Sequence, residues 1–162
     1  MRFTLVDKIT ELQAGQRITA IKNLSLAEEY LADHFPGFPV MPGVLMLEAM
    51  TQAAAWLIRA SEDFAHSTVV LKEARNVKYV NFVEPGQTLV VTAEVLDHGP
   101  RETKFKTSGS VDGVTVVSGR LVLERYNLAQ DDPTRTLTDN TVKMKLRELF
   151  ALLYPSGITS SV

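Results

Sequence analysis

The sequence contains no cysteine, which excludes a disulfide scaffold, a thiolate metal site and a cysteine nucleophile. It also has no run of about 18 apolar residues, the length that a membrane-spanning helix requires. Its N-terminus reaches charged residues before an apolar core of signal-peptide length has accumulated. We therefore expect a soluble cytoplasmic protein without a membrane span.

A strong charge of one sign is absent as well. The formal net charge is −2 at pH 7, whereas a nucleic-acid binder needs a concentrated basic face to neutralise phosphates. The three histidines are scattered, so they do not predict a metal site. The chain is 45% hydrophobic and 22% charged, and its 162 residues suit a single domain with its own core.

The N-terminal part of the chain has the pattern of a β-hairpin. Residues 3–26 alternate loosely between apolar and polar side chains, and Gly15 marks a turn between two short strands. A short helical piece from Ala27 to Ala32 is expected next, with Ser25 or Asn23 available as its N-cap.

A shaped loop and a long helix follow. The segment from His34 to Gly43 holds three of the seven prolines and two of the nine glycines, so it is neither a regular helix nor a central strand. The next segment, Val44 to Ser61, lacks glycine and proline and is apolar nearly all round, except at Glu48, Thr51 and Gln52. Such a pattern predicts a buried helix.

The rest of the core has the period of β-strands. The predicted strands are Thr68 to Val77, a stretch through Tyr79 and Phe82, Thr88 to Leu96, Thr103 to Ser110 and Val114 to Leu123. Turn signals separate them at Glu84-Pro85-Gly86, His98-Gly99-Pro100 and Asp112-Gly113. One long helix embraced by an antiparallel sheet is the simplest assembly, which places the chain in the α+β class.

The predicted domain comprises residues 1–126, and the C-terminal part is predicted to be an appendage to it. Residues Asn127 to Asp139 are polar and contain Pro133, so they are expected to form a linker. Asn140 to Leu153 has the apolar spacing of an amphipathic helix. Residues 127–162 are therefore interpreted as a linker and a helix that contacts the core or another protomer, rather than a membrane anchor.

Two side chains have the chemistry of a catalytic pair. Glu48 is expected to lie among Met, Leu and Ala side chains, where a carboxyl group keeps its proton more readily and can act as a general acid. His34 stands at the mouth of the shaped loop, and its imidazole is suited to act as the partner base.

The start of the helix offers a third element. With Pro42 at the first helical position, the backbone N–H groups of Gly43 and Val44 have no intrahelical partner and can bind a developing oxyanion. A glycine there also lets a substrate carbonyl approach the backbone closely. A base, an acid and an oxyanion site are what elimination of water from a 3-hydroxyacyl thioester requires.

The segment from His34 to Gln52, H-F-P-G-F-P-V-M-P-G-V-L-M-L-E-A-M-T-Q, resembles the 3-hydroxyacyl-[acyl carrier protein] dehydratases of fatty-acid synthesis. Weaker agreement extends over the N-terminal strands and through residues 83–89, and it fades after about Leu123. The resemblance implies a hotdog fold, no cofactor, and an acyl chain lying in a tunnel along a dimer interface. It also implies a homodimer in which His34 of one protomer meets Glu48 of the other, with three such dimers often forming a hexamer.

The resemblance also bears on single positions. Glu48 is similar to the general dehydratase branch, since the branch that also isomerises the double bond usually has Asp there. Gln52 resembles the family residue that orients the acid, although it could also bind a backbone group. Phe82 stands where the family commonly has proline, so it could narrow the tunnel and alter the preferred acyl length. The tail beyond Tyr126 has no counterpart in the shortest members and could cover the tunnel mouth.

Alternatives remain open at this point. A hotdog thioesterase would use a carboxylate near the same helix to activate water, although the intact H-F-P-G loop argues against it. A non-catalytic acyl-binding subunit is a further possibility. The substrate carrier is expected to be acyl carrier protein or coenzyme A, and an acidic carrier could dock on a basic patch. The candidates for that patch, each of which could also serve solubility alone, are Lys72, Arg75, Lys78, Arg101, Lys104, Lys106 and Arg120. His66 and His98 are expected to be solvated surface residues.

Overall fold

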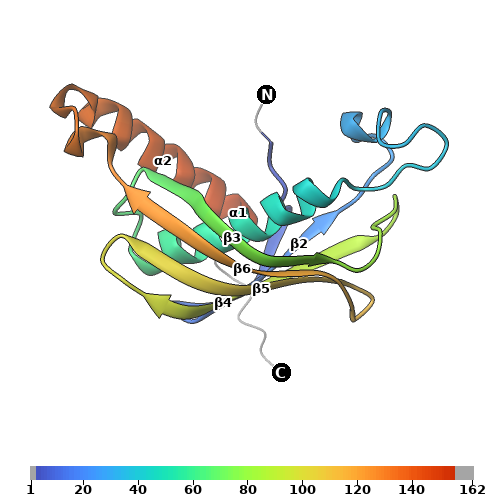
Figure 1. Ribbon diagram of the computed structural model, residues 1–162. Helices are drawn as coiled ribbons and strands as arrows, with labels where there is room; N and C mark the ends of the chain where they lie inside the picture. Colours follow the sequence, from blue (N-terminus) through green and yellow to red (C-terminus); the bar gives the residue numbers. More distant parts are fainter. Residues whose placement is uncertain (1–2, 156–162) are drawn as a thin grey trace.

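One antiparallel sheet and one long helix make up most of the described chain, residues 3–155 of the computed structural model. The six strands lie in the order β1-β2-β4-β5-β6-β3. Helix α1 (Gly43–Ser61) lies across one face of the sheet, and helix α2 (Thr136–Leu153) lies on the other side of α1 (Figure 1). The strands are β1 (Lys8–Gln13), β2 (Arg17–Asn23), β3 (Thr68–Tyr79), β4 (Thr88–His98), β5 (Glu102–Val111) and β6 (Val114–Tyr126). The expected α+β arrangement is confirmed.

Helix α1 packs on the sheet through a face of small and unbranched side chains. Ala49, Ala53 and Ala54 are fully buried, and Met50 and Leu57 lie beside them. Alanines at these positions let the helix backbone approach the strands closely, so the larger sheet residues fill the space between the layers. The sheet contributes the buried residues Ile18, Leu89, Val91, Phe105, Leu121 and Leu123.

The predicted turns hold better than the predicted short helix. Asp112 and Gly113 have φ angles of 50° and 80°, which is the backbone that a tight hairpin turn requires. The helical piece is only a 3₁₀ turn, η1 (Glu29–Leu31), without a side-chain cap. Ser25 instead accepts a hydrogen bond from the N–H of Ala27, which precedes η1, and Asn23 accepts one from the hydroxyl of Thr88. The predicted caps are therefore wrong.

Strand β3 is longer than predicted and irregular. Its pairing with β6 shifts register between Leu71 and Glu73 and again between Arg75 and Lys78. These bulges let the strand continue to Tyr79, where the sequence pattern suggested a break. Phe82 lies outside any strand, in the loop before β4, so its assignment to a strand is wrong.

Helix α2 begins earlier than predicted, at Thr136, and the expected linker contains two 3₁₀ turns, η2 (Leu128–Gln130) and η3 (Pro133–Arg135). The cause lies in Asp139, which was assigned to the linker. This residue is 3% exposed. Its carboxylate accepts hydrogen bonds from the Ser67 hydroxyl and from the N–H groups of Leu128 and Ala129. A polar residue thus anchors the first turn of the helix, which a polarity pattern cannot reveal.

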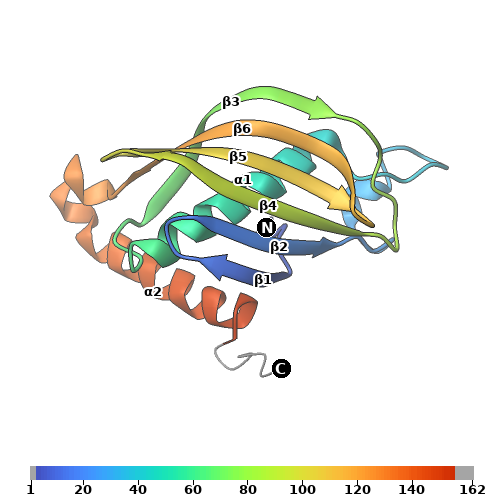
Figure 2. The same ribbon diagram turned by 90° about the horizontal axis from the view of Figure 1, so that it is seen from below.

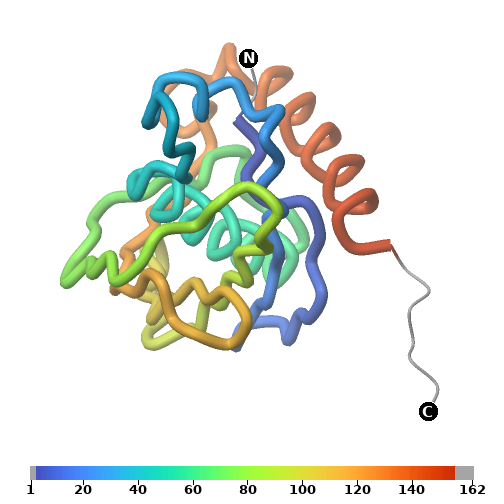
Figure 3. The backbone as a smooth tube through the Cα atoms, turned by 90° about the vertical axis from the view of Figure 1, so that its right-hand side faces the viewer, coloured from blue at the N-terminus to red at the C-terminus, as the bar shows by residue number. Residues whose placement is uncertain are grey.

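Helix α2 forms a third layer against the C-terminal half of α1. Figure 2 shows it beside α1 and β1, and Figure 3 shows it running along the outside of the core. The Phe150 ring lies 6.0 Å from that of Trp56 and 5.5 Å from that of Phe64, and Arg147 pairs with Asp63 at 2.7 Å. The expected contact between the tail and the core is therefore present. No helix within residues 3–155 is long and apolar enough to cross a membrane.

Candidate active site

The loop before α1 places His34 in a defined orientation. Two backbone hydrogen bonds join Phe35 and Phe38 to each other, and the N–H of Val40 donates to the carbonyl of His34 at 3.1 Å. The imidazole Nδ1 lies 3.2 Å from the carbonyl oxygen of Val40. Because that oxygen can only accept, Nδ1 carries the proton in this contact, and Nε2 of a neutral ring is left with its lone pair.

Glu48 and Gln52 are brought together on one face of α1, as their spacing predicts. Gln52 Nε2 donates to Glu48 Oε1 at 2.9 Å and to the carbonyl of Phe3 at 2.9 Å. Gln52 Oε1 accepts the N–H of Leu5 at 2.9 Å. Gln52 therefore contacts both the acid and backbone groups, so the two roles considered for it occur together.

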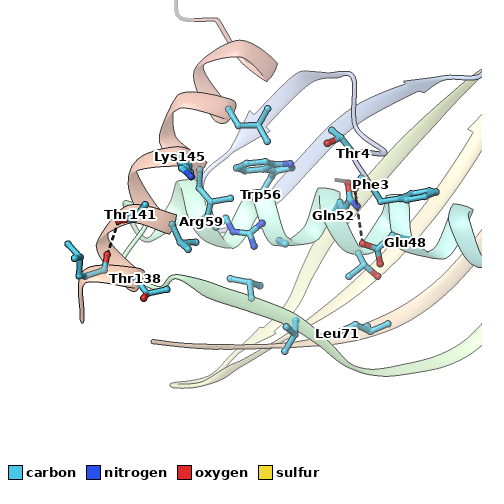
Figure 4. Close-up of a pocket in the computed structure, with 18 residues that line it drawn as sticks. Phe3, Thr4, Glu48, Gln52, Trp56, Arg59, Leu71, Thr138, Thr141 and Lys145 are labelled. Carbon is cyan, nitrogen blue, oxygen red and sulfur yellow. Dashed lines mark hydrogen bonds between the residues drawn. The ribbon is translucent and has the colours of Figure 1, made fainter. Parts of the chain in front are cut away.

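The burial expected of Glu48 is not complete in the single chain. Its side chain is half-buried, because it lines a cavity of about 790 Å³ between α1, α2 and β3 (Figure 4). Glu48 and Gln52 lie toward one end of this cavity, while Trp56 and Arg59 follow along the same helix. Glu48 is the only carboxylate that lines the cavity among residues 3–155.

The start of α1 differs by one residue from the prediction. Pro42 is the N-cap, and Gly43 is the first helical residue. No backbone acceptor in the described chain pairs with the N–H of Gly43 or Val44, so both donors remain available as expected. A Cβ on Gly43 would lie 3.0 Å from the Tyr79 ring. The glycine therefore also allows this aromatic ring to approach the helix start.

Apolar side chains around the helix start lie open to solvent. Val44 is 68% exposed and Phe82 is 53% exposed, and the Phe82 ring meets that of Phe38 edge-on at 5.7 Å. Neither Val44 nor Phe82 lines the cavity that contains Glu48. His34 does not line it either. A single chain thus joins Glu48 to Gln52 but leaves His34, Val44 and Phe82 outside the cavity.

The first 123 residues match the family model of the FabA-like domain. The chain belongs to the FabA-like family. Two curated relatives are each named 3-hydroxyacyl-[acyl-carrier-protein] dehydratase FabZ. The protein of Ruminiclostridium cellulolyticum is 40% identical over 119 residues, and that of Thiobacillus denitrificans is 40% identical over 123 residues. Each alignment spans 74% of this chain, with 84% and 85% of the respective relative. The predicted family is therefore confirmed.

A solved structure supports the fold of this FabA-like domain. The dehydratase heterocomplex ApeI:P from Xenorhabdus doucetiae has a chain that superposes with a TM-score of 0.66 at 19% identity. The match covers 82% of this chain and 90% of that chain. At that identity the likeness concerns the fold alone, and the predicted hotdog fold is confirmed. Because the family match ends at residue 123, helix α2 lies outside it.

Two residues were missed by sequence reasoning: Tyr79, whose ring lies against Gly43, and Arg59, which lines the cavity. Tyr79 was placed in a strand without a role, and Arg59 received none. One signal was available, since Glu48, Gln52, Trp56 and Arg59 follow each other at spacings of four, four and three on one helix face.

Of the two histidines assigned to solvated surface, His98 is exposed as predicted and His66 is partly buried, and both contact Glu62. His66 Nδ1 lies 3.0 Å from Glu62 Oε2, and His98 Nε2 lies 3.3 Å from Glu62 Oε1. Arg125, which is 4% exposed, contacts the same carboxylate at 2.7 Å. These contacts tie the end of α1 to β4 and β6, far from the loop of His34. No group of three or more His, Asp or Glu side chains in the described part of the chain is arranged so that it could hold a metal ion.

The candidate basic patch is largely neutralised. Four of its residues pair with carboxylates: Lys72 with Glu102, Arg75 with Glu73, Arg101 with Glu124 and Lys104 with Asp97. Lys106 and Arg120 are cross-strand neighbours on β5 and β6. Docking of a carrier on this surface stays a prediction.

Proposed function

We propose that this chain eliminates water from 3-hydroxyacyl thioesters on acyl carrier protein, with His34 as general base and Glu48 as general acid. The product would be the trans-2-enoyl thioester. The observation that carries this proposal is the position of Glu48. Gln52 orients its carboxyl group, and Glu48 is the only carboxylate of residues 3–155 that lines the acyl-sized cavity.

The predicted enzyme class, a 3-hydroxyacyl-[acyl carrier protein] dehydratase of fatty-acid synthesis, is confirmed by the curated relatives and the family match. Those relatives are named for acyl carrier protein, which is why we propose this carrier ahead of coenzyme A. The cytoplasmic location stays a prediction.

His34 would remove a proton from C2 of the substrate. The contact between Nδ1 and Val40 leaves the lone pair of Nε2 free to accept that proton. The same contact fixes the ring plane, and the resulting imidazolium keeps its hydrogen bond to the carbonyl. The electrons of the broken C–H bond move toward the thioester carbonyl, whose oxygen becomes negative.

The N–H group of Gly43 would stabilise that oxygen, because the first turn of α1 presents unpaired donors and the positive end of the helix dipole. Val44 offers a second N–H at the same place. Glu48 would then donate its proton to the C3 hydroxyl, the C–O bond would break, and water would leave. Proton exchange with solvent would return His34 and Glu48 to their starting states.

The site would be shared between two copies of the chain. Several apolar residues near the loop and the start of α1 are exposed in one copy: Phe35, Phe38, Val44, Tyr79, Val80 and Phe82. Exposed apolar side chains gathered near one loop favour a protein partner. Strand β3 also stands at the end of the sheet order, so its outer edge is available to pair with a second copy.

A two-fold axis at this edge would bring the loop of one protomer toward the cavity of the other, which fits the absence of His34 from the lining of its own cavity. We therefore propose a homodimer as the functional unit. Assembly of three dimers into a hexamer stays a prediction.

The activity can be tested by incubating the purified protein with 3-hydroxyacyl carrier protein and following the acyl group by mass. Loss of one water is expected, and His34→Ala and Glu48→Gln should each lower kcat by roughly 100-fold or more. His98→Ala provides a histidine control outside the site. Release of the free acid would instead identify a thioesterase, and absence of turnover at every chain length would identify a non-catalytic acyl-binding subunit.

A further inference from the structure

Arg59 is a cation inside the cavity that contains Glu48. It lies on α1 roughly three turns, about 16 Å, beyond Glu48. Its Nε is buried and has no hydrogen-bond partner within residues 3–155. Buried guanidinium groups usually bind a carboxylate or phosphate, because an unpaired one forfeits its hydration without compensation.

The surroundings of Arg59 favour its charged form but supply no counter-ion. Its guanidinium carbon lies 5.2 Å from the centre of the Trp56 ring, which favours a cation. Burial lowers the pKa of Arg59 to about 10, so the group is still a cation at neutral pH. Glu48 is the only carboxylate that lines the cavity among the described residues, and it lies at the other end, hydrogen-bonded to Gln52.

A second cation reaches the same end of the cavity from α2. Lys145 lines it together with Thr138 and Thr141, and Figure 4 shows all three on the helix that covers Arg59 and Trp56. Neither Lys145 nor Arg59 takes part in an ion pair within residues 3–155. A partly buried arginine and an exposed lysine, neither of them paired with a carboxylate within residues 3–155, therefore lie at one end of a largely apolar cavity.

We propose that Arg59 and Lys145 form a subsite for an oxyanion group of the acyl thioester substrate. This inference rests on the proposed function, because it takes Glu48 as the position of the reacting carbons. The oxyanion is either a carboxylate at the far end of the acyl chain or the phosphate of the phosphopantetheine arm. Both present oxygens that a guanidinium binds with two parallel hydrogen bonds.

The geometry favours the carboxylate. The subsite lies toward the C-terminal end of α1 and beneath α2, whereas the open apolar surface of the loop lies at the N-terminal end (Figures 1 and 4). In the proposed mechanism the thioester carbonyl is bound at the N–H of Gly43, at the N-terminal end of α1, so the acyl chain extends toward the covered end. Helix α2 then selects the substrate by supplying Lys145.

The test uses two sets of matched 3-hydroxyacyl thioesters. In the first, acyl chains of equal length end in a methyl or a carboxylate group on the same carrier. In the second, one acyl chain is attached to pantetheine or to phosphopantetheine. We expect kcat/KM to favour the carboxylate-ended chain by about tenfold or more at the length that spans Glu48 to Arg59. One charge-assisted hydrogen bond accounts for a ratio of this size.

Variants of Arg59 and Lys145 test whether these two residues cause the preference for the carboxylate-ended chain. Arg59→Met and Lys145→Met keep much of the side-chain volume and should reduce or abolish the preference for the carboxylate-ended chain over the methyl-ended chain. Arg59→Lys should keep part of it. Lys8→Met, an exposed cation on β1, controls for total charge and should change nothing. Thermal unfolding of each variant checks that the fold is intact.

The outcomes separate this inference from the proposed function. If methyl-ended chains lose water but neither anionic substrate is preferred, or if Arg59→Met lowers kcat/KM equally for every substrate, the subsite is wrong and the dehydratase stands. A preference that resides in the phosphopantetheine pair and disappears in Arg59→Met supports the subsite with phosphate as its ligand. Absence of water loss from every substrate overturns both proposals.

Discussion

Gln52 donates a hydrogen bond from Nε2 to Oε1 of Glu48 at 2.9 Å while its own Oε1 accepts the N–H of Leu5. The amide is also bound to the carbonyl of Phe3. The candidate acid is thus fixed to the chain segment that precedes β1, and any change at Gln52 should affect both the orientation of Glu48 and the stability of that segment.

Replacing Gln52 with methionine should lower kcat by about tenfold with little change in KM, because the acid loses its orientation but the cavity keeps its volume. The unfolding free energy should fall by about 1–3 kcal/mol, since backbone groups lose their partners. Steady-state kinetics and urea unfolding measure the two effects. Gln13→Met, on the exposed end of β1, should change neither. An unaltered kcat in Gln52→Met would reduce Gln52 to a purely structural role.

Adding a methyl group to Gly43 should abolish most of the activity without unfolding the protein. The new Cβ would lie 3.0 Å from the ring of Tyr79, which is 49% exposed and can move aside. Activity should fall by roughly 100-fold if the methyl also blocks the approach of the thioester to the helix N–H groups. The double variant Gly43→Ala/Tyr79→Leu discriminates the causes, since recovery of activity there would mean that only the displaced ring matters.

The anchoring of α2 by Asp139 should make its stability depend on pH. Burial raises the pKa of this carboxyl, but its hydrogen bonds from Ser67, Leu128 and Ala129 on balance hold the pKa below its usual value. A lowered folded-state pKa contributes stability above the unfolded value of about 3.9, and this contribution is lost as pH falls through the folded value.

Wild type should therefore be more stable than Asp139→Asn at pH 7, and the gap should shrink below about pH 4, near the unfolded-state pKa. Denaturant unfolding from pH 7 to pH 3 measures it. Asp112→Asn, in the exposed turn between β5 and β6, serves as the control. A gap that stays constant over this range would show that the charge of Asp139 does not anchor the helix.

Two positions on α2 should differ sharply in their effect on stability. Phe150 packs against Trp56 and Phe64, so Phe150→Ala should lower the unfolding free energy by about 2 kcal/mol, less than for a fully buried ring. Leu152 is 77% exposed, and Leu152→Ala should stay within about 0.5 kcal/mol of wild type. Equal effects of the two substitutions would mean that α2 does not pack on α1 as described.

The sequence predicts the centre of the site well because its residues are close together in the chain. The loop from His34 to Gly43 is marked by its prolines and glycines, and α1 begins within one residue of its predicted start and ends where predicted. The contact of Glu48 with Gln52 follows from helical geometry alone. The family resemblance gave the fold and the enzyme class, which pattern and composition could not.

The parts that failed depend on contacts between distant segments. The start of α2 was placed four residues too late, because Asp139 reads as a loop residue until Ser67 and the backbone of η2 are seen to bind it. Arg59 received no role, because only α2 and β3 make it a lining residue of the cavity. Bulges in β3 hid its continuation to Tyr79 in the same way.

The most direct test of the central claim is complementation between inactive protomers. His34→Ala and Glu48→Gln proteins are mixed in equal amounts, subunit exchange is verified by native mass spectrometry, and water loss from a 3-hydroxyacyl carrier protein is measured. Random pairing into two-fold dimers should restore about one quarter of wild-type activity, because half of the dimers then hold one intact site. Activity that stays at the level of the separate variants after full exchange would contradict a site built from His34 of one protomer and Glu48 of its partner.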